Sequence, residues 1–77
     1  MLNGKINEIL SNRRQELGMD IKELSEKVGL SVVSLYHYEK GEVLPCIGNL
    51  YRLSNALKLN YDELYELFLE EKKSRKV

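Results

Sequence analysis

Residues 21–40, IKELSEKVGLSVVSLYHYEK, predict two short helices joined by a tight turn. Asp20 and Glu23 have the spacing of a capping box, so the first helix begins directly after Asp20. Gly29 ends it, because glycine readily takes the left-handed conformation that follows a helix. Ser31 is a favourable N-cap for the second helix. The apolar side chains that pack these two helices together recur at helical spacing: Leu24, Val28, Leu30, Leu35 and Tyr38.

Three more helices are predicted around this pair. One covers residues 3–17 and ends at Gly18, one covers residues 47–57 after Pro45, and one begins at Tyr61. Their apolar stripes are expected to be Ile6, Leu10 and Leu17; Ile47, Leu50, Leu53 and Leu57; and Leu64, Leu67 and Phe68. The pattern predicts an all-α fold, a compact five-helix domain over residues 1–71, with a basic and disordered tail at 72–77.

Length and charge limit the range of functions. The 77 residues allow one small domain with a modest core, which dimerisation would enlarge. The formal net charge is zero, whereas nucleic-acid-binding domains usually show a basic surface. No apolar run is long enough to span a bilayer, and no signal peptide is recognised at the N-terminus, so a cytoplasmic location is expected.

The sequence offers no set of residues for catalysis, metal binding or a cofactor. Cys46 is the only cysteine and His37 the only histidine, so neither a disulfide, a Cys or His metal site nor a Ser-His-Asp triad has a second member. No cofactor motif is present. We therefore expect a binding protein without a cofactor rather than an enzyme.

Most of the chain resembles the lambda-repressor-like, Cro/CI-type (XRE family) helix-turn-helix domains. The matching segments are RRQELGMDIKELSEKVGLSVVSLYHYEKGEVLP and LYRLSNALKLNYDEL. The residues in the motif positions are Arg14, Gly18, Met19, Asp20, Leu24, Ser25, Gly29, Leu30, Ser31, Tyr38, Glu39, Lys40, Gly41 and Pro45. The resemblance implies a sequence-specific transcriptional regulator, a repressor that is often dimeric. It also implies a structural ion pair between Arg14 and Glu39 rather than a role for Glu39 in base contact.

In this architecture the second helix of the pair enters the major groove of DNA. The residues expected to contact bases are Ile21, Val32, Val33, Tyr36 and His37. Family members usually carry Gln, Arg, Ser or Thr at several of these positions, so the apolar residues here favour contact with thymine methyl groups over hydrogen bonds to bases. The residues expected to contact phosphates are Arg13, Lys22, Ser31, Ser34, Lys40 and Asn49.

The last helix carries more apolar residues than one core-facing stripe can hold. We expect the surplus to form a two-fold dimer interface from Tyr61, Tyr65, Leu67, Phe68 and Leu69. Such a dimer would place two recognition helices about 34–36 Å apart on a palindromic operator. The alternative is a protein-interaction module of the same fold, with an apolar face made of Ile21, Val32, Val33, Val43 and Leu44.

Overall fold

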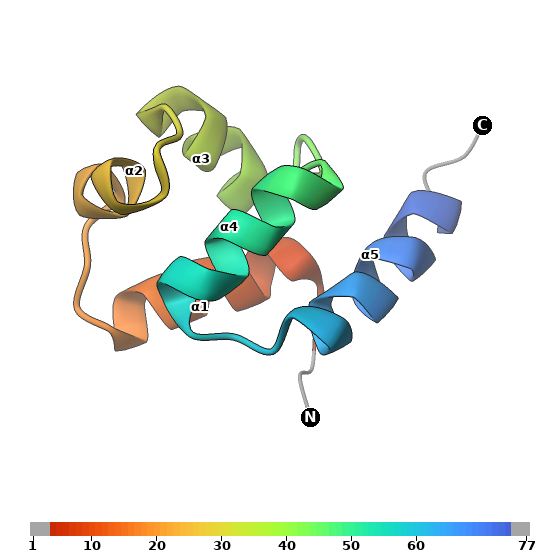
Figure 1. The fold of residues 1–77 in the computed structure, drawn as a ribbon. Coiled ribbons are helices and arrows are strands. Elements are labelled where there is room, and N and C mark those ends of the chain that lie inside the picture. Colours follow the sequence, from red (N-terminus) through yellow and green to blue (C-terminus); the bar gives the residue numbers. More distant parts are fainter. Residues whose placement is uncertain (1–3, 75–77) are drawn as a thin grey trace.

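A computed structural model describes residues 4–74, and these residues form five helices (Figure 1). The helices are α1 (Ile6–Glu16), α2 (Ile21–Val28), α3 (Val32–Lys40), α4 (Ile47–Leu57) and α5 (Tyr61–Ser74). The five-helix all-α fold expected from the sequence is confirmed. None of these helices is long and apolar enough to cross a membrane.

Local sequence signals set the bounds of α2 and α3. The Asp20 carboxylate accepts a hydrogen bond from the Glu23 amide at 2.8 Å, and the Glu23 carboxylate accepts one from the Asp20 amide at 3.0 Å. Gly29 follows α2 with φ of 75°, a conformation that costs a residue with a Cβ about 1 kcal/mol or more. Because α3 begins only three residues later, the two helices form a compact helix-turn-helix unit.

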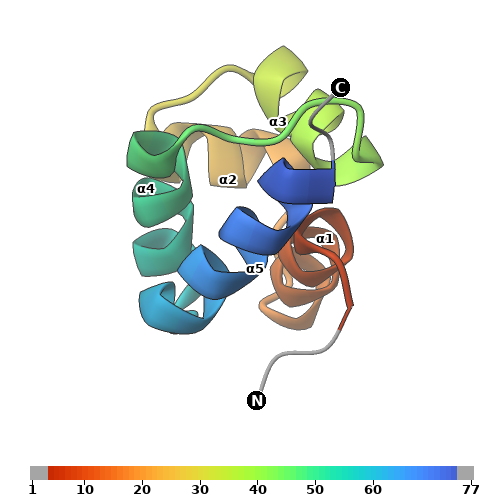
Figure 2. The same cartoon turned by 90° about the vertical axis from the view of Figure 1, so that its right-hand side faces the viewer.

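One hydrophobic core joins all five helices. Figure 2 shows α4 and α5 side by side, with α1 packed beside α5 and the α2–α3 unit lying across the end of the bundle. The buried apolar side chains come from every helix: Ile6, Ile9, Leu10, Leu24, Val28, Leu35, Leu50, Leu53, Leu57, Leu64 and Phe68. Leu35 is the buried side chain of α3, and Tyr38 also packs against the core, whereas Val32, Val33, Tyr36 and His37 remain exposed.

Two residues expected in the core are exposed. Leu17 follows the last residue of α1, where the chain leaves the helix, and the buried residues of α1 are Ile6, Ile9 and Leu10. Ile47 begins α4 at the edge of its buried stripe, which runs through Leu50, Leu53 and Leu57.

Helix α1 starts later than expected and α5 ends later. Gly4 and Lys5 precede α1, which begins at Ile6, and Asn3 lies outside the described residues. The sequence predicted a disordered tail from residue 72, but residues 72–74 continue α5, so the prediction is wrong for these three residues. Lys72 Nζ lies 5.6 Å from the centre of the Phe68 ring, and the Glu71 carboxylate accepts a hydrogen bond from the Ile6 amide at 2.6 Å. The Glu71–Ile6 hydrogen bond joins the end of α5 to the start of α1, whereas the Lys72–Phe68 contact lies within α5. Residues 75–77 lie outside the described part of the chain.

Candidate nucleic-acid interface

Helix α3 presents the candidate contact residues at one end of the molecule (Figure 1). Its first turn is closed by Ser31, whose Oγ accepts a hydrogen bond from the Ser34 amide at 3.1 Å. On its outward side Val33 is 64% exposed and Tyr36 is 53% exposed, and Val32 and His37 are also exposed. The structure therefore brings together four of the five residues expected to contact bases.

The fifth, Ile21, lies differently. It begins α2 and packs partly against the core, so only part of its side chain reaches the surface. Ile21 nevertheless borders an open hollow of about 340 Å³ between α1, α2 and α3. The hollow is lined by Ser11, Arg14, Ile21, Tyr36, Glu39 and Lys40.

Lys40 places a positive charge at the edge of the hollow, over the ring of Tyr36. Its Nζ lies 4.5 Å from the centre of the Tyr36 ring, one turn earlier on α3. A cation above an aromatic face at this distance is attracted by the ring quadrupole. Tyr36 and Lys40 therefore form one unit beside the hollow, with an aromatic ring and an ammonium group exposed together.

The Arg14–Glu39 pair connects α1 to α3. Arg14 Nε donates to Glu39 Oε2 at 2.9 Å and Arg14 Nη2 donates to Glu39 Oε1 at 3.0 Å. The side chains are 16% and 10% exposed, and Arg14 Nη1 also donates to the Met19 carbonyl at 2.8 Å. The hydrogen bonds to Glu39 raise the pKa of Arg14 above its ordinary value. This planar two-bond geometry restricts the angle between α1 and α3.

The other acidic group near α3 pairs with its histidine. His37 Nδ1 and Glu42 Oε1 lie 2.5 Å apart, at the end of α3 and the start of the following loop. The hydrogen bond with His37 lowers the pKa of Glu42, which is therefore a carboxylate at neutral pH. Both side chains are exposed, so this negative charge lies on the same surface as the candidate base contacts.

The residues expected to contact phosphates divide into two groups. Lys40 on α3 is exposed and lines the hollow, and Lys22 is exposed in the first turn of α2. Ser31 and Ser34 form the cap of α3. Asn49 Nδ2 instead donates to the Tyr38 hydroxyl at 2.9 Å, a contact that joins α4 to α3.

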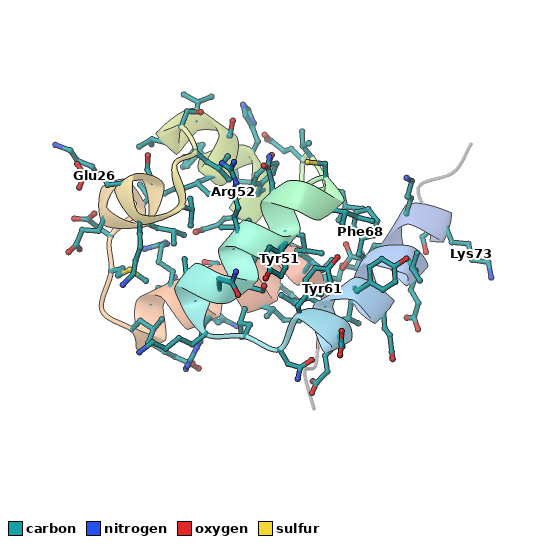
Figure 3. All side chains as sticks on the ribbon, in the orientation of Figure 1. Glu26, Tyr51, Arg52, Tyr61, Phe68 and Lys73 are labelled. Atoms are coloured by element: carbon teal, nitrogen blue, oxygen red, sulfur yellow. The ribbon has the colours of Figure 1, made fainter. Side chains whose placement is uncertain are left out.

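Arg13 does not lie with the other candidate residues. Its Nε donates to the Leu57 carbonyl at 2.9 Å and its Nη1 pairs with Glu16 at 3.2 Å. These contacts hold its guanidinium at the C-terminal end of α4, which in Figure 1 points away from α3. An arginine that the sequence pattern did not select, Arg52, lies instead beside the turn between α2 and α3 (Figure 3).

The surface expected to form a dimer interface is only partly exposed. Phe68 is 5% exposed and belongs to the core, so its assignment to the interface is wrong. Leu67 also packs against the core, whereas Leu69 is exposed and Tyr65 is 36% exposed. The reason is that α5 turns its Leu64–Phe68 stripe toward α1 and α4.

Tyrosines line the outer side of α4 and α5. The Tyr51 and Tyr61 rings meet edge to face with centres 5.3 Å apart, and the Tyr61 and Tyr65 rings are stacked at 6.0 Å (Figure 3 labels the first pair). Tyr51 was not expected from the sequence, because it lies on a different helix ten residues before Tyr61. Its position between core leucines, Leu50 and Leu53, did indicate an outward orientation.

Within the described residues, no group of three or more His, Cys, Asp or Glu side chains is arranged to hold a metal ion. The candidate interface presents apolar, aromatic and basic side chains of α2 and α3 together with the carboxylate of Glu42.

Comparison with known proteins agrees with this geometry. The model of a helix-turn-helix family matches residues 10–64, which include α2, α3 and α4 in full. The chain belongs to this helix-turn-helix family. The Cro/CI-type resemblance noted in the sequence is thereby confirmed.

Two relatives of this helix-turn-helix chain are repressors. It is 37% identical over 60 residues to the cryptic phage CTXphi transcriptional repressor RstR of Vibrio cholerae serotype O1, covering 78% of this chain. The chain spans 54% of the length of that relative. The crystal structure of the P22 c2 repressor protein in complex with synthetic operator 9T in the presence of Tl⁺ superposes with a TM-score of 0.74 at 32% identity. That match covers 80% of this chain and 94% of the repressor chain.

Proposed function

We propose that this protein is a sequence-specific DNA-binding transcriptional regulator that acts in the cytoplasm as a dimeric repressor. Helix α3 docks in the major groove, with Val32 and Val33 against thymine methyl groups and Tyr36 and His37 along base edges. The observation that carries the proposal is the outward face of α3: four side chains free at the surface of a helix anchored by Leu35. Similarity to two repressors, one of them solved on operator DNA, supports it.

Phosphate contacts in this proposal come from two sources. Lys40 supplies charge at the edge of the hollow and Lys22 supplies charge in the exposed first turn of α2. The amides at the N-termini of α2 and α4 supply donors aligned with the helix dipoles. Ser31 and Ser34 lie at the start of α3, within reach of the groove wall. Asn49 is bonded to the Tyr38 hydroxyl and Arg13 to the Leu57 carbonyl, so the phosphate contacts of this proposal do not include Arg13.

Selection from a random pool of DNA duplexes at low salt tests the function directly. We expect enrichment of an inverted repeat whose half-sites are about one helical turn apart and rich in A·T pairs where the valines dock. Failure to bind any duplex at low salt would contradict the proposal. It would favour the second candidate, a protein-interaction module in which exposed Val33 and Val43 contact a protein partner.

The dimer is proposed to form through the exposed part of α5 together with the tyrosines beside it. Tyr65 and Leu69 lie one turn apart on the outer side of α5, and Tyr61 and Tyr51 continue this apolar surface onto α4. Two copies related by a two-fold axis would bury these residues against their equivalents.

Tyr65→Glu is expected to convert the dimer to a monomer in sedimentation and to weaken binding to the inverted repeat about tenfold or more. Binding to a single half-site should be nearly unchanged, because α3 is not altered. Gln15→Glu, which adds the same charge on exposed α1 away from α5, is the matched control. A Tyr65→Glu variant that still sediments as a dimer would exclude this surface.

Glu42→Gln is expected to tighten binding to all duplexes a few-fold at low salt, with little change in sequence preference. The variant removes a carboxylate from the surface that faces phosphates, and the effect should fade as salt screens the charge. Electrophoretic or fluorescence titrations at two salt concentrations measure it. Weaker binding by this variant would show instead that Glu42 is needed to orient His37.

A further inference from the structure

The charge on α4 is unusual among the helices of this chain. Helix α4, with the sequence IGNLYRLSNAL, contains no acidic residue, and Arg52 is its single charged residue. A basic residue on a helix is commonly balanced by an acidic residue three or four positions away. The corresponding positions here are Gly48, Asn49, Asn55 and Ala56, so nothing on α4 balances Arg52.

The location of the Arg52 guanidinium is defined by the turn between α2 and α3. A Cβ atom placed on Gly29 would lie 3.8 Å from Arg52 Nη1, so the guanidinium is in van der Waals range of that turn. In Figure 3, Arg52 lies on the side of α4 toward α3, whereas the acidic Glu26 of α2 points outward at the far side of the molecule. Arg52 is therefore near the start of α3 and remote from that carboxylate.

Arg52 also differs from the other arginines that the structure describes. Arg14 is paired with Glu39, and Arg13 is held by the Leu57 carbonyl and Glu16. For Arg52, which is exposed, the described residues provide no ion pair and no hydrogen bond to its guanidinium. Its charge and its five donors are thus available to a ligand.

We propose that Arg52 binds a backbone phosphate of the operator beside the turn that leads into α3. A helix with its side chains is about 10–12 Å across, close to the width of about 12 Å of the major groove. A side chain beside the turn that leads into α3, as Arg52 is beside Gly29, therefore lies toward the wall of the groove, which is made of phosphates. The planar guanidinium can bind one such phosphate through two parallel hydrogen bonds. This inference rests on the proposed docking of α3 and adds a contact from a helix that contributes no base readout.

The contact would make up in part for the zero net charge of the chain. A phosphate contact releases about one counterion, so each one adds about 0.9 to the slope of log affinity against log salt. It carries no sequence information, and so it would tighten specific and non-specific binding alike.

The test compares wild type, Arg52→Gln, Arg52→Lys and Lys58→Gln in titrations with the selected operator and with a random duplex. Arg52→Gln is expected to lower the salt slope by about 0.9 on both duplexes and to bind more weakly at low salt. The ratio of wild-type to variant affinity should then shrink about threefold between about 50 and 200 mM salt. Arg52→Lys should keep most of the slope, because it keeps the charge. Lys58→Gln removes a charge from the far end of α4 and should leave the slope unchanged.

Two outcomes separate this inference from the proposed function. Wild-type protein that binds no duplex would overturn the docking of α3 and this inference with it. Wild-type binding with an unchanged salt slope in Arg52→Gln would overturn the phosphate contact alone. A structural role beside Gly29 would instead lower the melting temperature of Arg52→Gln while the slope stays constant, and this result would also count against the proposal.

Discussion

Val33→Asp is expected to weaken operator binding by at least about 100-fold, which corresponds to about 2.7 kcal/mol. Val33 is the most exposed apolar side chain of α3 and lies in its first turn, where the proposed docking brings it against base edges. A carboxylate there would face the negative potential of the groove, and like charges brought together at an interface cost several kcal/mol. Affinity for the operator, measured by titration at constant salt, gives the result.

The same substitution should leave the fold intact. An acidic residue in the first turn of a helix interacts favourably with the helix dipole, and α3 has no acidic residue there. The melting temperature of Val33→Asp is therefore expected to equal or slightly exceed that of wild type. Asn55→Asp, an equal change of charge on the exposed side of α4 toward its C-terminus, is the control for long-range electrostatics. If Val33→Asp binds as wild type does, α3 does not dock as proposed.

Glu39→Ala is expected to lower the free energy of unfolding by about 2–3 kcal/mol. Removal of one partner leaves the Arg14 guanidinium largely buried without its carboxylate, and the loss reaches about 3–5 kcal/mol when such a pair is fully buried. The pair here retains 16% and 10% exposure, so we expect a loss somewhat smaller than that of a fully buried pair. For a domain of this size the loss corresponds to a melting temperature lower by about 10–20 °C.

A matched series separates the ion pair from side-chain packing. Glu66→Ala, on the exposed side of α5, should melt within about 4 °C of wild type, because surface substitutions usually change stability by less than about 0.5 kcal/mol. Replacing both partners, as in Arg14→Met with Glu39→Leu, should recover part of the loss since no unpaired charge remains. At a temperature where the variant is folded, Glu39→Ala should select the same operator sequence as wild type. Unchanged melting temperature would show that the pair contributes nothing to stability.

The helix-turn-helix unit could be predicted because its signals are local. Each signal acts on backbone groups within four residues of itself. The Asp20–Glu23 capping box begins α2, Gly29 ends it, and Ser31 begins α3, so both helices have the bounds that the sequence indicates. The outward face of α3 follows from the same regularity, since burying Leu35 turns Val32, Val33 and Tyr36 toward solvent.

Tertiary packing decided the features that depend on how one helix is rotated against another. Helix α5 is apolar on several sides, so only its contacts with α1 and α4 determine that Phe68 is buried and Leu69 exposed. Long-range contacts likewise join Glu71 of α5 to Ile6 of α1, and Asn49 of α4 to Tyr38 of α3.

Arg13 on α1 and Arg52 on α4 show that the sequence alone could not place the charged residues of the candidate site. The sequence indicated Arg13 as a phosphate contact and gave no reason to select Arg52, yet Arg13 is held by the Leu57 carbonyl and Arg52 lies beside Gly29. These partners are 44 and 23 residues away along the chain, a separation that no helical period or cap signal spans. Periodicity and capping therefore determined which residues form α3 and face outward. The packing of α1 and α4 against the α2–α3 unit decided which charged side chains of those helices lie near α3.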